Sequence, residues 1–421
     1  MKKVKGGIKL TNTKTVKPVS AGERIKELDI VRGFALFGVL LVNIAMFNST
    51  LMEEIAGVSP LANPLQLTAL SDKISSLFIQ IFAEGKFYTI FSFLFGLGFY
   101  IFMDRAEAKT NSPRRLFARR SFFLFLFGML NFTLVWFGDI LHAYGIIGFL
   151  LILFKNCRVK TIRNWMIALL SISIILYSFF MLSNDLMYEF LDEETISAYN
   201  AQTQMQAEES LDVYGNGSFI EVVSYRLQNE LSLVAMSLVV LIPKILGMFL
   251  IGFYVGKRKI FEDIKGNLGF IKKVWKTAGI VGLLSTLVYV LIQFEAIVVN
   301  RLFYSGSITF FSEIATVFLS LFYITSLVLL YHKTNIKSLL MPLSYMGQMA
   351  LTNYLVQCIL CSILFYGYGF GLLNKANLAT GILITIIIYI GQIFFSKAWL
   401  SKYKYGPFEW VWRYLTYGGS L

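Results

Sequence analysis

The chain is poor in the residues that build metal centres and disulfide frameworks. It has two histidines and three cysteines among 421 residues. Two histidines cannot form a multi-histidine centre, so no metal is expected. Cys157 lies in a basic segment, whereas Cys358 and Cys361 lie three apart within an apolar run. A redox or metal motif is one interpretation of this pair, and two small residues in a lipid-embedded helix are the favoured one.

Charged residues are scarce as well, at 15% of the chain against 56% hydrophobic residues. Soluble domains carry about 25% charged residues, so this composition excludes an ordinary soluble domain. The net charge of +13 does not indicate a nucleic-acid partner, because the basic residues flank apolar runs instead of forming one stripe. Lys and Arg in such positions are typical of side chains that face anionic lipid headgroups, so membrane lipids are the expected partners.

Long apolar runs are what the chain has in abundance. A bilayer core of about 30 Å takes roughly 20 helical residues. Ten runs meet or approach that length, at residues 29–48, 74–103, 117–137, 139–154, 163–182, 233–255, 275–294, 309–331, 342–366 and 379–398. The sequence therefore predicts an all-α, polytopic helical membrane protein with about ten transmembrane helices.

The hydrophilic gaps between the runs alternate in charge. Lys and Arg gather in every second gap, while the long segment 183–232 is acidic and has Arg226 as its one basic residue. The positive-inside rule then predicts that both termini are cytoplasmic. We expect a basic cytoplasmic segment over residues 1–28, a transmembrane helical domain over 29–398 that includes the outer segment 183–232, and an amphipathic cytoplasmic tail over 399–421.

The first run carries a polar stripe. Asp29, Arg32 and Asn43 fall within roughly a 60° arc of one helix, so they face the bundle interior. Asp29 and Arg32 are one turn apart and are expected to pair. Ionisable residues within a span are functional candidates by default. A structural ion pair together with an interhelical hydrogen bond is an equally good interpretation.

The second run is interrupted by Glu84, Gly85 and Lys86. A glycine between opposite charges, inside a run too long for one straight span, favours a broken helix whose freed backbone lines a cavity. An anchor at the membrane interface is the alternative.

Asp139 and His142 form the sharpest pair. They are three residues apart at the start of the fourth run, so on a helix they share one face. A carboxylate in that position orients the imidazole, as in the base half of a base–nucleophile arrangement. Alternatively, Asp139 is a helix N-cap and His142 a structural hydrogen-bonder.

Five segments stand in order along the chain: RIKELDIVRGFALFGVLLVNI, GKFYTIFSFLFGLGF, GDILHAYGI, MGQMALTNYLVQ and YGPFEWVWRYLTYG. Together they resemble the YeiB-like family of largely uncharacterised bacterial membrane proteins, over about residues 24–418. This resemblance implies a multi-pass protein of the bacterial plasma membrane.

The first run is more distantly similar to that of the heparan-alpha-glucosaminide N-acetyltransferases, which share the Asp-x-x-Arg-Gly start and an Asn eleven residues after the Arg. Asp29, Arg32, Gly33 and Asn43 match that pattern. The similarity implies a transmembrane acyltransferase that takes acyl-CoA from the cytosol. Those enzymes use a histidine just after the first span, but residues 44–73 here contain none. Either His142 has taken that role or the chemistry differs.

The leading hypothesis is an integral membrane acyltransferase with acyl-CoA as donor and an unknown acceptor. His142, oriented by Asp139, is the expected general base, and Asn43 the donor to the oxyanion. The expected substrate-binding residues are Asp29, Arg32, Glu84, Lys86, Arg114, Arg115, Arg119 and Arg120, of which the arginines suit CoA phosphates. The alternatives are a transporter or a lipid- or small-molecule-binding protein, and a scaffold without chemistry. A homodimer is one possible assembly.

Overall fold

The computed structural model describes residues 24–61, 67–108 and 110–418, so most of the predicted N-terminal basic segment lies outside the described residues. Every regular element within these ranges is helical. The helices are α1 (Lys26–Phe47), α2 (Leu51–Ile55), α3 (Leu70–Phe82), α4 (Lys86–Glu107), α5 (Pro113–Leu134), α6 (Leu141–Leu151), η3 (Ile152–Phe154), α7 (Val159–Phe190), α8 (Glu193–Asn216), α9 (Phe219–Tyr225), η4 (Arg226–Glu230), α10 (Leu231–Lys257), α11 (Leu268–Gln293), η5 (Arg301–Phe303), α12 (Tyr304–Tyr331), α13 (Thr334–Gln348), α14 (Ala350–Phe365), α15 (Leu378–Lys402) and α16 (Pro407–Tyr417).

The predicted all-α membrane architecture is confirmed. Among the described residues, seven helices are long and apolar enough to cross a membrane, and an eighth results if the bent pair α13–α14 is one span. The predicted spans 117–137 and 139–154 correspond to α5 and to the short apolar helix formed by α6 and η3. The total of ten spans stays a prediction, because α5 and α6 fall outside the seven.

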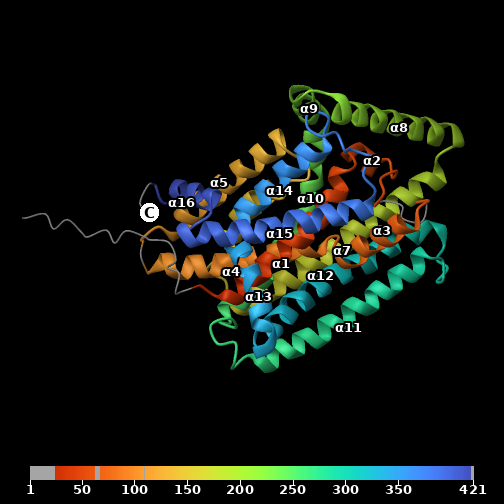
Figure 1. Ribbon diagram of the computed structural model, residues 1–421. Coiled ribbons are helices and arrows are strands. Elements are labelled where there is room, and N and C mark those ends of the chain that lie inside the picture. Colours follow the sequence, from red (N-terminus) through yellow and green to blue (C-terminus); the bar gives the residue numbers. More distant parts are fainter. Residues whose placement is uncertain (1–23, 62–66, 109, 419–421) are drawn as a thin grey trace, which may run out of the picture.

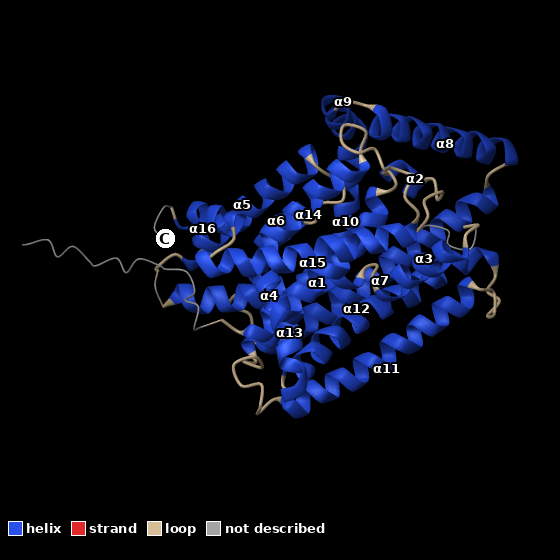
Figure 2. Cartoon of the chain, in the orientation of Figure 1, coloured by secondary structure: helices blue, strands red, loops and turns tan. Residues whose placement is uncertain are grey.

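Helix α1 lies inside the bundle and packs against α4, α12, α13, α14 and α15 (Figure 1). Its apolar residues are buried on all sides, which is typical of a central helix. The pairs α11–α12 and α5–α6 pack on the flanks, and short loops join most of the elements (Figure 2). Helix α16 lies at one end of the bundle and α8 at the other (Figure 1).

Two helix breaks shape the interior. The first falls between α3 and α4, where the sequence predicted it: Gly85 has a φ of 76°, a conformation that favours glycine. The second is a 78° bend between α13 and α14. At this bend Glu409 of α16 accepts the N–H groups of Leu351 and Thr352 at 2.7 and 3.1 Å, so its carboxylate caps the start of α14.

Segment 183–232 is largely helical, and α8 is the longest helix that lies wholly within it. The fully buried Arg226 joins it to the bundle, because its guanidinium donates to the carbonyl of Thr133 on α5 at 2.9 Å and to the hydroxyl of Tyr214 on α8 at 3.2 Å. Tyr214 in turn donates to Glu230 at 2.8 Å. A buried guanidinium that is hydrogen-bonded in this way fixes the position of α8 over α5.

Helix α2 closes the same end of the bundle. Thr50 and Glu53 form a capping box, and the Thr50 hydroxyl lies 2.6 Å from that of Ser210 on α8. Glu53 is buried here, and this burial raises the pKa of its carboxyl from 4.5 to about 7.

Because of Glu53, the stability of the folded protein is expected to depend on pH. The native carboxyl keeps its proton up to about pH 7, whereas the unfolded chain loses it near pH 4.5, so the free energy of unfolding falls as the pH rises between these values. Glu53→Gln is expected to reduce that fall by on the order of 1 kcal/mol. Unfolding in SDS at pH 5 and pH 8 measures it, with the exposed Glu208→Gln as control. Equal pH dependence of wild type and Glu53→Gln would contradict this expectation.

Candidate functional site

A cavity of about 1660 Å³ runs through the bundle. Its wall includes residues of α1, α4, α5, α6, α7, α10, α12, α14 and α16. One end lies beside Arg24, which is the first described residue, and Arg413 of α16. We call this the terminal end of the cavity. The opposite end lies beside Leu51, Ile55 and Leu61, near α2. The cavity therefore extends from one end of the bundle to the other.

The terminal end of the cavity is basic. Four arginines line it, namely Arg24, Arg32, Arg120 and Arg413. Asp29 lies beside two of them, with a carboxylate oxygen 2.7 Å from the Arg32 guanidinium and another 3.7 Å from that of Arg24. The predicted Asp29–Arg32 pair thus forms.

Arg120 and Arg413 are held by aromatic rings. The Arg120 guanidinium lies 3.8 Å from the ring centre of Trp412, and the Arg413 guanidinium lies 4.3 Å from that of Tyr405. Glu409, the nearest carboxylate on α16, is engaged by the start of α14. Stacking orients the guanidinium planes without neutralising their charge, so this end of the cavity suits an anion.

The middle of the cavity holds the α3–α4 break. Glu84 and Lys86 both line the cavity. Lys86 is buried, and its ammonium donates to the carbonyl of Gln80 at 2.6 Å. Glu84 is exposed, although its neighbours Ala83 and Lys86 are buried, so its side chain extends into the cavity. The expectation that the broken helix lines a cavity is confirmed.

Sequence reasoning missed a second charged pair in the same region. Lys244 of α10 and Glu313 of α12 line the cavity, with the ammonium 2.7 Å from one carboxylate oxygen and 2.8 Å from the other. The Lys244 ammonium also lies 5.1 Å from the ring centre of Tyr88. Both residues stand within the predicted runs 233–255 and 309–331. An ionisable residue inside each run was the signal that could have found them.

Asp139 and His142 form the expected pair at the start of α6. The Asp139 carboxylate lies 3.0 Å from His142 Nδ1 and accepts the His142 backbone N–H at 2.9 Å. Its second oxygen accepts from Asn131 at 2.9 Å and from the Tyr354 hydroxyl at 3.3 Å. The Nε2 atom of His142 is buried and has no hydrogen-bond partner among the described residues. The imidazole is therefore oriented and keeps one nitrogen free.

The structure brings only part of the predicted site together. Asn43, Arg32, Glu84, Lys86 and Arg120 line the cavity. Among the described lining residues, His142 and Asp139 are missing, although Gly138, Ile140, Leu141 and Tyr354 are present.

The remaining predicted arginines lie elsewhere. Arg114, Arg115 and Arg119 are exposed on the surface of α5 and do not line the cavity as the structure describes it. Asp29 is buried beside the cavity and does not line it as described, but its carboxylate pairs with Arg24 and Arg32, which do. Of the four predicted arginines on α5, Arg120 alone therefore lines the basic end among the described residues.

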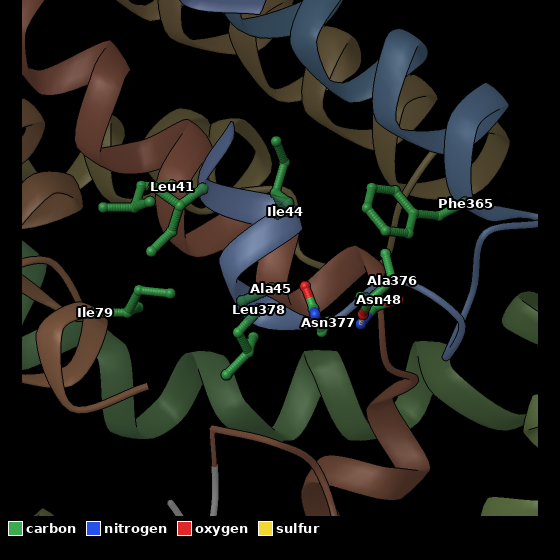
Figure 3. A pocket seen from close by; sticks show the side chains of 11 residues that line it. Leu41, Ile44, Ala45, Asn48, Ile79, Phe365, Ala376, Asn377 and Leu378 are labelled. Carbon is green, nitrogen blue, oxygen red and sulfur yellow. Dashed lines mark hydrogen bonds between the residues drawn. The ribbon is translucent and has the colours of Figure 1, made fainter. Parts of the chain in front are cut away.

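A second pocket, of about 10 Å³, lies where α1, α3 and α15 meet (Figure 3). Asn48 lines it, and its side-chain amide nitrogen donates to the carbonyl of Ala376 at 2.6 Å. The side-chain amide oxygen of Asn48, Oδ1, is buried without a partner among the described residues. A space of this size holds about one water molecule. It is not a substrate site.

These features define a class: a multi-pass helical membrane protein with a charged internal cavity. The family described as "Protein of unknown function (DUF418)" matches residues 255–419. The chain is 31% identical to the uncharacterised protein YxaH of Bacillus subtilis over 415 residues, which cover 96% of each protein. It is 28% identical to the uncharacterised protein YeiB of Escherichia coli, covering 94% of this chain and 96% of YeiB. The chain belongs to the family of YxaH and YeiB, as its motifs predicted.

Proposed function

We propose that this protein is an integral acyltransferase of the bacterial plasma membrane, with both termini in the cytoplasm. It takes an acyl group from cytosolic acyl-CoA at the terminal end of the cavity and passes it to an acceptor nearer the outer face. The observation that carries the proposal is one continuous cavity, which joins a cluster of arginines at one end to Asn43 and the charged helix break further along.

The basic end supports recognition of the CoA phosphates. Four arginines line it, and the two carboxylates beside them are Asp29, which two arginines share, and Glu409, which caps α14. The surplus of positive charge suits phosphate groups, which guanidinium groups bind in bidentate fashion. The largely apolar wall beyond this end, with Phe91, Leu94 and Phe95, has room for the acyl chain.

The transfer step needs an oxyanion donor and a base. Asn43 lines the cavity, and its amide has no hydrogen-bond partner among the described residues, so it is available to the developing oxyanion. The base is His142, because Asp139 accepts from its Nδ1 and leaves Nε2 with the lone pair that takes the proton. His142 does not line the cavity as described, so the acceptor group must reach beyond the cavity wall to meet Nε2. The acceptor attacks the thioester carbonyl and gives its proton to the base. The carbon–sulfur bond then breaks, and the CoA thiolate leaves and takes up a proton.

Binding of CoA to the purified protein tests the donor half of this proposal. Arg120→Gln is expected to weaken acetyl-CoA binding about 10-fold, because it removes a charge-assisted contact to phosphate. Arg114→Gln, on the same helix but exposed outside the cavity, is expected to change binding less than about 2-fold. Isothermal titration calorimetry in detergent measures both, with melting temperatures as the check on folding. Absence of saturable binding to the wild type, or equal effects of the two variants, would overturn the proposal.

Transport is the second candidate function. The observation that favours it is the Lys244–Glu313 pair next to a broken helix, since ion pairs and discontinuous helices within the membrane mark substrate paths in transporters. Flux of a solute into proteoliposomes without consumption of acyl-CoA would favour transport over acyl transfer.

A further inference from the structure

Glu84 is the charged group in the middle of the cavity that lacks a close partner. Lys244 and Glu313 neutralise each other at 2.7 Å, and Lys86 donates to the Gln80 carbonyl. The carboxylate of Glu84 makes no hydrogen bond or ion pair with another described residue, and it extends into the cavity. A carboxylate in that situation is a ready acceptor for a ligand ammonium group.

Groups that suit an anion lie directly beside this carboxylate, at the start of α4. Helix α4 begins at Lys86, and the first N–H groups of a helix have no partner within the helix. The partial positive charge of the helix start adds to the Lys86 ammonium, which has three donors and uses one for Gln80. These groups together suit a phosphate oxygen.

The charges of this region are balanced, which restricts the ligand. Glu84 and Glu313 offset Lys86 and Lys244, and each of the other three acts electrostatically on Glu84. A ligand with net charge would leave an uncompensated charge inside the bundle, which is costly in a low-dielectric environment. A zwitterion brings one charge of each sign and keeps the balance.

The size and lining of the cavity indicate that the ligand also has an apolar part. Sites for small molecules usually measure about 300–1,000 Å³, and this cavity is larger, at about 1660 Å³. Met236 and Val239 of α10 line it, and each is 70% exposed. Apolar wall of this extent, accessible along α10, matches hydrocarbon chains better than a small polar solute. Tyr289 also lines the cavity, and its buried hydroxyl has no partner among the described residues.

We propose that the middle of the cavity binds the ethanolamine phosphate headgroup of a phospholipid. The ammonium group is bound by the Glu84 carboxylate, and the phosphodiester lies at the start of α4 beside Lys86. The acyl chains lie along the apolar wall of α10. This inference does not depend on acyl transfer, because it concerns which lipid the cavity holds and not what is done to it.

The test compares three probes on the purified full-length protein: dihexanoyl phosphatidylethanolamine, dihexanoyl phosphatidylglycerol and glycerophosphoethanolamine. The first is expected to bind about 10-fold tighter than the second, which lacks the ammonium group. Glycerophosphoethanolamine, which has the headgroup without chains, is expected to bind at least about 10-fold more weakly than the first. Equal affinity for phosphatidylethanolamine and phosphatidylglycerol would overturn the proposal. Equal affinity for phosphatidylethanolamine and glycerophosphoethanolamine would show that the site binds the headgroup without chains, which would overturn a phospholipid as the ligand.

Glu84→Gln is the decisive variant. It removes the charge and keeps the shape, and no ion pair of Glu84 is lost, so the protein is expected to fold. The preference for phosphatidylethanolamine over phosphatidylglycerol is expected to vanish in Glu84→Gln and to persist in Glu208→Gln, an exposed control on α8. A preserved preference in Glu84→Gln would overturn the site. Acetyl-CoA binding to the wild type is measured separately on the same preparation. Because the preference between the two lipids is read without acetyl-CoA, failure at this site and failure of the proposed donor binding are distinguishable.

Discussion

Replacing Gly96 with alanine is expected to destabilise the protein by about 3 kcal/mol, because α4 and α10 cross in backbone contact at this point. A β-carbon at Gly96 would lie 1.8 Å from the carbonyl oxygen of Phe249. The contact is reciprocal, since a β-carbon at Gly252 would lie 2.0 Å from the carbonyl oxygen of Phe93. Both positions need a residue without a side chain, as in other close helix crossings within membranes. Since both helices line the cavity, their separation would also distort it.

Gly98→Ala is the matched control on the same helix. A β-carbon there has no neighbour within 4 Å, so the change is expected to be neutral or slightly stabilising through better helix propensity. Unfolding of both variants in SDS, followed by tryptophan fluorescence, measures the difference. Equal stability of Gly96→Ala and Gly98→Ala would contradict the close crossing of α4 and α10.

His142→Ala is expected to lower acyl transfer by about 10²–10⁴-fold, the usual contribution of a general base. The Asp139 carboxylate accepts from Nδ1, which leaves Nε2 with a free lone pair, and no other described residue occupies it. The reaction followed is the incorporation of label from [¹⁴C]acetyl-CoA into a product other than CoA, in membrane vesicles from cells that produce the protein.

His332→Ala is the control, because His332 is the other histidine of the chain and lies exposed at the end of α12, 3.3 Å from Glu27. It is expected to change transfer less than about 2-fold. Undiminished transfer in His142→Ala would remove His142 from the mechanism while leaving the acyltransferase proposal intact. Absence of transfer in the wild type would instead contradict acyl transfer itself.

The parts of the site that sequence predicted are local ones. Asp29 and Arg32 pair, and Asp139 contacts His142, because residues three apart on a helix share a face whatever surrounds the helix. The break at Gly85 was predicted for a similar reason: a glycine and two charges interrupt an apolar run at a fixed place in the chain.

The parts that sequence missed depend on how helices rotate against each other. Lys244 and Glu313 are 69 residues apart and meet because α10 and α12 turn both side chains into one cavity. Arg120 faces the cavity while Arg114 faces outward, although both stand on α5. The predicted joint action of Asn43 and His142 in one reaction also depends on how their helices are rotated, and of the two only Asn43 lines the cavity as described.

Sequence by itself determined the membrane class, the helical content and the family, because apolar runs of bilayer length leave the backbone no alternative to helices that satisfy their own hydrogen bonds. Tertiary structure alone decided where the cavity lies and which charges line it. The reason is that lipid-facing and cavity-facing positions differ by the rotation of each helix, and that rotation is set by close contacts such as those of Gly96 and Gly252 with neighbouring backbone.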